Sequence, residues 1–170
     1  KFAKRSFLYN VKLEFGDLHP KQPIDYQVAL IKKMGVEFEE IAPSVHIPES
    51  AHTKADKLLR SEGIDPHESF CILHPGAKPY DRWEAEKFAQ LADRIYAQHH
   101  LKTLWTCGPG QELMVDEITP HIKNAPYAFI STNLETLGAI TQKAQFVVCH
   151  DGGYINFASA LGIPLVGLCG

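Results

Sequence analysis

Two short glycine turns hold the residues of this chain whose types and spacing suit chemistry. The first is Asp151-Gly152-Gly153, which follows the apolar run 146–149 and precedes a predicted helix over 155–161. Glycines let a ligand approach the backbone closely, and the helix behind them offers unpaired N–H groups and the positive end of its dipole. The turn therefore predicts a binding site for an anion, in particular for a phosphate group.

The second turn is His74-Pro75-Gly76-Ala77, which follows the apolar run 70–73. With one glycine and two nearby prolines, it cannot form the tight bend of a G-x-G-x-x-G dinucleotide motif. The one near match, Gly108 to Leu113, lacks the third glycine, and no Walker A loop occurs. If the strands before the two turns are neighbours in a parallel sheet, both turns meet at its carboxyl edge, where such sheets bind ligands.

The elements that must position these turns alternate along the chain. A helix over 84–98 has a clear apolar face, and Thr132-Asn133-Leu134-Glu135 resembles a capping box that opens a helix to about 143. The pattern predicts an α/β fold, with a Rossmann-like parallel sheet flanked by helices. Its strands are expected at 70–73, 103–107, 127–130, 146–149 and 165–169, its other helices at 111–122 and 155–161, and two leading helices at 24–34 and 50–60.

Composition narrows the class of protein further. The chain has 170 residues, is 45% hydrophobic and carries a net charge of -3, which argues against a nucleic-acid partner. No apolar stretch approaches the roughly 20 residues that cross a bilayer, so we expect a cytoplasmic protein. The four cysteines lie in or next to apolar runs without metal-binding spacing, and we expect all of them to be buried thiols: Cys71, Cys107, Cys149 and Cys169.

Three segments together resemble glycosyltransferase family 9, which includes the ADP-heptose:lipopolysaccharide heptosyltransferases. They are HPGAKPYDRWEAEKFAQLA, TCGPGQE and STNLETLGAITQKAQFVVCHDGGYINFASALGIPLVGLCG, within residues 72–170. The resemblance implies the C-terminal half of a GT-B fold. Residues 45–170 would form the Rossmann-like donor-binding domain, truncated at its C-terminal end. Residues 1–44 would be a remnant of the N-terminal domain and an interdomain helical segment.

The resemblance also assigns roles within the donor site. The turn that holds the donor diphosphate falls on Asp151, Gly152 and Gly153, where Gly152 replaces a hydroxyl residue and Asn156 a histidine. Asp81 occupies the position of a basic residue, so Lys78 or Arg82 would supply the cation. Glu112 would contact the ribose and the turn before the third helix would receive the adenine. The expected donor-binding residues are His74, Gly76, Ala77, Lys78, Arg82, Glu112, Asn133, Leu134, Asp151, Gly152, Gly153 and Asn156.

The activity implied by this resemblance is inverting transfer of heptose or a related sugar. ADP-heptose is the implied nucleotide-sugar substrate, with no cofactor and no metal ion. The acceptor would be lipid A-core or another glycan. An aspartate of the protein's own N-terminal domain would be the general base, so we expect the isolated chain to bind the donor without turning it over. The resemblance also leaves open a peripheral contact with the inner membrane.

Two other functions remain open at the level of sequence. A metal-dependent hydrolase could use His74, His150 and Asp151, which all lie at predicted strand ends, although no close-spaced ligand motif occurs. The other of these two functions is that of a non-catalytic nucleotide-binding module. Asp151 also suits a helix cap, and Trp83 suits a core anchor better than a surface that stacks on a base.

Overall fold

The computed structural model describes residues 10–13, 23–37, 43–77 and 82–169. Its internal contacts divide the chain into two units, Lys1–Ile41 and Ala42–Gly170. The first unit contains helix α1, Pro23–Lys33, which confirms the helix expected there. Proline suits the first turn of a helix because its missing N–H would have no partner there, and Gly35 follows the helix with a positive φ of 82°.

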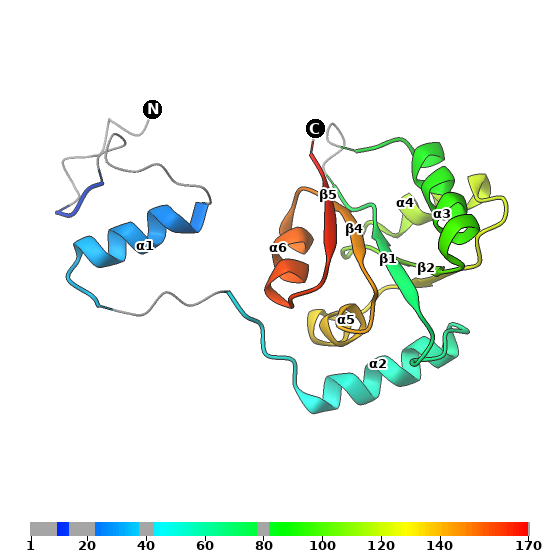
Figure 1. Cartoon of the computed structure of the whole chain (residues 1–170), viewed down its shortest axis with the longest axis horizontal. Helices are drawn as coiled ribbons and strands as arrows, with labels where there is room; N and C mark the ends of the chain where they lie inside the picture. Colours follow the sequence, from blue (N-terminus) through cyan, green and yellow to red (C-terminus); the bar gives the residue numbers. More distant parts are fainter. Residues whose placement is uncertain (1–9, 14–22, 38–42, 78–81, 170) are drawn as a thin grey trace. The chain divides into compact units, whose positions relative to one another are not determined.

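The second unit is built on a five-stranded parallel sheet with the strand order β3-β2-β1-β4-β5 (Figure 1). This confirms the predicted α/β class and the Rossmann-like order. The central pair, β1 and β4, is far apart in sequence but in register from Ile72 with Val147 to His74 with Cys149. The strands are β1 (Phe70–His74), β2 (Lys102–Thr106), β3 (Tyr127–Ile130), β4 (Val147–His150) and β5 (Leu165–Leu168).

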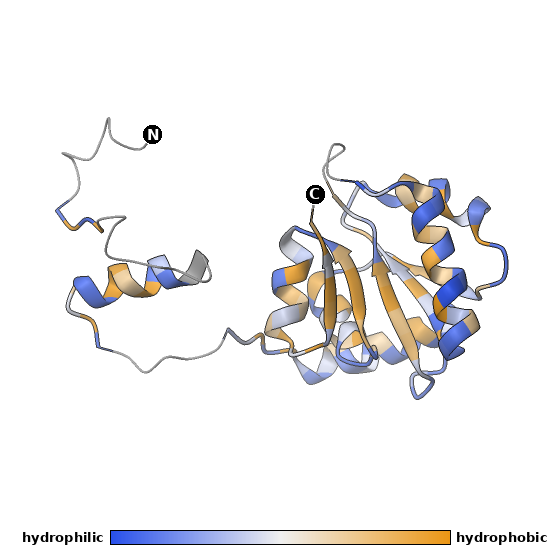
Figure 2. Cartoon of the chain, turned by 45° about the horizontal axis from the view of Figure 1, so that its top comes forward, coloured by the Kyte–Doolittle hydropathy of each residue, from blue (hydrophilic) through white to orange (hydrophobic). Residues whose placement is uncertain are grey.

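Helices cover both faces of this sheet, so successive residues of the central strands enter different cores. Ile72 of β1 packs with helices α2, α5 and α6, whereas the next residue, Leu73, packs with α3 and α4. The apolar strands stand out in Figure 2 between more polar helices. These helices are α2 (Glu49–Ser61), α3 (Ala85–His99), α4 (Glu112–Ile118), α5 (Leu134–Thr141) and α6 (Gly153–Ala160).

Two helix ends differ from the sequence prediction. α4 stops at Ile118 and continues as the 3-10 turn η4, Thr119–His121, because Pro120 has no N–H to donate and its ring would collide with an earlier carbonyl. α5 is capped by Asn133 and not by Thr132: the Asn133 side chain accepts a hydrogen bond of 2.9 Å from the Thr136 N–H. The expected capping box at residues 132–135 is therefore wrong by one residue.

The prediction of four buried thiols holds for three of them. Cys71, Cys107 and Cys149 are buried, and burial is the main cause that raises their pKa values to about 12, 11 and 11. Cys169 is exposed, because it follows the end of edge strand β5. Within the described residues, no helix is both long enough and apolar enough to cross a bilayer.

The carboxylate of Asp93 fastens α3 to the segment that leads into β3. It accepts hydrogen bonds from the backbone N–H groups of Lys123 (3.0 Å), Asn124 (2.8 Å) and Ala125 (2.9 Å). Burial alone would raise the pKa of Asp93, but these donors outweigh burial and hold the pKa below its usual value of 3.8.

We expect Asp93→Asn to lower the free energy of unfolding by about 1–2 kcal/mol at pH 7, because the donors lose a charged acceptor. Since the folded-state pKa of Asp93 is depressed, its ionised form stabilises the fold above the usual pKa of 3.8, and this contribution disappears as the pH falls through the folded-state pKa. Urea unfolding of both proteins at pH 7 and at pH 3 measures the effect. A difference that does not shrink at pH 3 would contradict this assignment.

Candidate functional site

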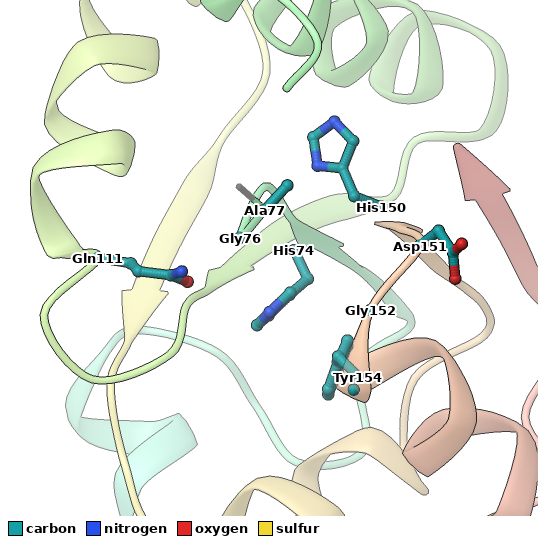
Figure 3. A pocket seen from close by; sticks show the side chains of 9 residues that line it. His74, Gly76, Ala77, Gln111, His150, Asp151, Gly152 and Tyr154 are labelled. Carbon is teal, nitrogen blue, oxygen red and sulfur yellow. The ribbon is translucent and has the colours of Figure 1, made fainter. Parts of the chain in front are cut away.

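A cavity of about 480 Å³ opens at the carboxyl edge of the sheet, between the ends of β1 and β4 (Figure 3). This is the place where the strand order reverses direction, and the volume lies in the range of small-molecule sites. The lining residues are His74, Gly76, Ala77, Gln111, His150, Asp151, Gly152, Gly153 and Tyr154. The two turns singled out in the sequence therefore meet in one pocket.

The glycine turn forms the rim on the β4 side. Gly152 is the N-cap of α6 in an extended conformation, with φ 177°, and Gly153 is the first helical residue. A Cβ built on either glycine would meet none of the surrounding atoms within 4 Å, so there is open space beside the start of α6, where the first N–H groups of a helix have no partner within it. Asp151 is exposed and does not cap the helix; its own N–H donates to Leu168 O at 3.1 Å.

The other side of the pocket is built tightly around Gly76. An ideal Cβ on Gly76 would lie 2.5 Å from Gln111 Oε1 and 2.9 Å from His74 Nε2. Gln111 precedes α4, and its Oε1 accepts a hydrogen bond from the Gly108 N–H at 3.3 Å. Its side chain reaches toward His74 in Figure 3. Glycine at position 76 is thus required by close approach of neighbouring side chains.

The floor of the pocket is an aromatic pair that carries no charge at neutral pH. The His74 ring stacks on Tyr154 with centroids 4.2 Å apart, and its Nδ1 lies 3.0 Å from Thr106 Oγ1. Burial, and next the neighbouring His150, lower the pKa of His74 to about 4. Burial also raises the pKa of Tyr154 to about 12, while its hydroxyl is hydrogen-bonded to Thr141 Oγ1 at 2.8 Å.

The remaining predicted residues that the structure describes do not line this cavity. Arg82 is exposed, and its Nε donates to Ala77 O at 3.0 Å, which places the guanidinium next to a lining residue. Asn156 is exposed on α6 and donates to Gly152 O at 3.4 Å, so it folds back on the start of its own helix. Lys78 and Asp81 lie outside the described residues.

Glu112 and the turn before α5 lie beyond β1, at the carboxyl ends of β2 and β3. Glu112 Oε1 accepts from Gly110 N at 3.3 Å and from Ser131 Oγ at 3.5 Å, which joins the two loops. The Asn133 side chain caps α5, and Leu134 is 62% exposed. Both loops therefore lie along the same sheet edge as the pocket, at its β3 end.

Sequence reasoning missed Gln111 and Tyr154, and it assigned Trp83 to the core. Trp83 is 36% exposed and contacts Phe88 edge-on, so the prediction of a buried anchor is wrong. Tyr154 could have been noticed as the aromatic residue directly after the glycine pair. Gln111 gave no local signal, because its place in the pocket depends on the contact between its loop and Gly76.

The metal-site hypothesis finds no support in this geometry. Both ring nitrogens of His150 face backbone groups, with Nδ1 3.2 Å from Pro75 O and Nε2 2.9 Å from the Trp83 N. Across the part of the chain that the structure describes, no three His, Cys, Asp or Glu side chains are grouped to hold a metal ion.

The fold and the pocket define an α/β protein with a candidate ligand site at the switch point of a parallel sheet. The family model for glycosyltransferase family 9 (heptosyltransferase) matches residues 5–170. The chain belongs to glycosyltransferase family 9. This confirms the resemblance stated from the sequence motifs.

A known relative supports this family assignment, and similar solved structures support the fold of the chain. The chain is 27% identical over 124 residues to the lipopolysaccharide core heptosyltransferase OpsX of Haemophilus influenzae, covering 71% of this chain and 35% of that protein. The chain is similar in structure to a glycosyl transferase family 9 protein from Veillonella parvula. The match covers 94% of this chain and 45% of that protein, with 20% identity and a TM-score of 0.79. The structure of E. coli heptosyltransferase WaaC with ADP is also similar: the match covers 95% of this chain and 49% of that protein, with 17% identity and a TM-score of 0.63. The chain thus spans a third to a half of the length of these relatives, and the likeness confirms the expected fold, the Rossmann-like half of a GT-B protein.

Proposed function

We propose that this chain is the donor-binding part of a heptosyltransferase, which transfers heptose or a related sugar from a nucleotide diphosphate, with ADP-heptose as the donor. The observation that carries the proposal is the pocket between β1 and β4, where the open start of α6 faces a loop shaped around Gly76. Family membership and relatives named as heptosyltransferases support the reaction class.

The donor would lie along the carboxyl edge of the sheet. Its diphosphate would bind the backbone N–H groups at Gly152 and Gly153, where the helix dipole favours negative charge. From there the nucleoside would extend past β1 and β2, so that the Glu112 carboxylate accepts hydrogen bonds from the ribose and the base lies near Leu134. The exposure of Leu134 and the position of Glu112 between the two loops support this direction.

Transfer with inversion would build negative charge on the departing diphosphate. The N–H groups of α6 and the Arg82 guanidinium, held next to the pocket by Ala77, would stabilise that charge without a metal ion. A well-placed donor of this kind contributes about 3–4 kcal/mol to a transition state. Since His74 is neutral at pH 7, the floor of the pocket would add no cation.

The remaining components are proposals of the same kind. The acceptor would be lipid A-core or a similar glycan, as the name of the Haemophilus influenzae relative suggests. The general base would come from the protein's own N-terminal domain, and the enzyme would work in the cytoplasm at the inner membrane surface. Sugar transfer by the full-length protein would separate this function from that of a non-catalytic nucleotide-binding module, which would show none.

Calorimetric titration of the 170-residue chain with ADP, UDP and GDP tests the donor site. We expect ADP to bind with a dissociation constant in the micromolar to millimolar range and more tightly than the other two nucleotides. Tighter binding of UDP or GDP would support the diphosphate site but overturn ADP-heptose as the proposed donor. No heat from any nucleotide at millimolar concentration would overturn the donor-site proposal itself.

Replacing Gly152 with serine should strengthen ADP binding. The extended backbone at position 152 suits any residue, nothing lies within 4 Å of the added Cβ, and the hydroxyl could donate to the diphosphate. One such hydrogen bond corresponds to about a threefold to tenfold gain in affinity. Gly152→Ala is the matched control, because it adds the Cβ without the hydroxyl. Equal ADP affinities for the two variants would contradict the placement of the diphosphate.

A further inference from the structure

The imidazole of His150 connects the end of β4 to both ends of the loop between β1 and α3. His150 is 3% exposed. Its Nδ1 lies 3.2 Å from Pro75 O, at the start of that loop, and its Nε2 lies 2.9 Å from Trp83 N, near the loop's end. One side chain thus bridges two backbone groups that are far from it in sequence, on either side of the pocket residues Gly76 and Ala77 in the chain.

These two partners define the protonation state of the ring. A carbonyl oxygen can only accept a hydrogen bond and a backbone N–H can only donate one. Nδ1 therefore carries the proton and donates to Pro75, whereas the lone pair of Nε2 accepts from Trp83. Both contacts are satisfied together only by the neutral Nδ1–H tautomer.

Neighbouring contacts hold the ring and the loop in this arrangement. Phe88 of α3 meets His150 edge-on, with centroids 5.2 Å apart, and meets Trp83 edge-on at 5.4 Å. Within the loop, Arg82 Nε donates to Ala77 O at 3.0 Å. Side chains of β4, of α3 and of the loop itself therefore contact the two ends of the loop.

We propose that His150 is a positioning residue for the donor: it holds the two ends of the β1–α3 loop, at Pro75 and Trp83, so that both sides of the pocket are in place before the diphosphate binds. This inference rests on the proposed function of the pocket. A site that is ordered in advance binds more tightly, because less freedom is lost on binding. His150 would thus affect the affinity for the donor through the two loop ends that it holds.

Three variants test this role. His150→Phe keeps an aromatic ring next to Phe88 and removes both hydrogen bonds, so ADP should bind about tenfold more weakly. His150→Gln places an amide oxygen near the position of Nε2, where it can accept from the Trp83 N–H, and should restore part of that loss. Val147→Ala, in the buried part of the same strand, is the control for lost stability alone: its melting temperature should fall while its ADP affinity stays within about twofold of the wild type.

Nuclear magnetic resonance of the nucleotide-free chain gives a readout that a purely structural role would not move. The ¹⁵N spectrum of His150 should show a protonated Nδ1 and an unprotonated Nε2, and the Trp83 amide should exchange with solvent faster in His150→Phe but not in Val147→Ala. The opposite tautomer, or an ADP affinity of His150→Phe equal to the wild type, would overturn the inference. Absence of ADP binding by the wild type would instead overturn the proposed function on which the inference rests.

Discussion

Replacing Gly153 with aspartate is expected to abolish measurable ADP binding while leaving the fold intact. Gly153 is the first residue of α6, and a Cβ added there would meet none of the surrounding atoms within 4 Å. A carboxylate at this point would lie close to the proposed diphosphate, and repulsion between like charges at about 4 Å corresponds to a hundredfold or greater loss of affinity. Calorimetric titration with ADP measures this loss.

The Gly153→Asp variant should be about as stable as the wild type or slightly more stable, although it loses ADP binding. A negative side chain in the first turn of a helix interacts favourably with the helix dipole, so the free energy of unfolding should stay equal or rise by about 0.5 kcal/mol. Gly153→Asn is the matched control, since it has the same shape without the charge, and we expect it to retain most of the ADP affinity. Equal ADP binding by Gly153→Asp and the wild type would show that the diphosphate does not bind at this helix.

Replacing Gly76 with valine is expected to weaken ADP binding about tenfold or more, because the new side chain cannot fit beside its neighbours. Its Cβ alone would lie 2.5 Å from Gln111 Oε1 and 2.9 Å from His74 Nε2. The Gln111 side chain is the end of a flexible chain and could move, but the His74 ring is held by its stack on Tyr154 and by Thr106. The loop would therefore shift away from the pocket.

A double variant separates this steric effect from a general loss of stability. In Gly76→Ala combined with Gln111→Ala, the closer of the two collisions is removed and only the contact with His74 remains. We expect the double variant to bind ADP more tightly than Gly76→Ala alone. An affinity equal to that of Gly76→Ala would mean that Gln111 does not shape the loop.

The strands and most helices were predictable because their residues follow simple periods and stop at glycine or proline. The run 70–73 is apolar on both faces, as a central parallel strand requires, and α3 carries its apolar residues at helical spacing. Helix ends were less predictable, since the missing N–H of Pro120 and the side-chain cap of Asn133 are local features that a periodic pattern does not contain. The exposure of Cys169 depends on β5 being an edge strand, which sequence alone does not show.

The parts of the site that consist of short sequence motifs were predictable. Both glycine turns were recognised because backbone approach and a helix start leave a short signature in the sequence. The contacts of His150 with Pro75 and Trp83, and of Gln111 with Gly76, join residues from different loops. Such contacts follow only from the three-dimensional arrangement, so the shape of the pocket could not be derived in advance.

The central claim is that a nucleoside diphosphate binds at the start of α6, and the most direct test is an NMR titration of the ¹⁵N-labelled chain with ADP. We predict that the largest shifts occur at the amides of Gly152, Gly153 and Tyr154, with smaller ones at Gly76 and Ala77. A second cavity of about 540 Å³ lies between α3 and η4 and is lined by residues such as Arg94 and Lys123. Shifts confined to that cavity, or no shifts at saturating ADP, would contradict the account.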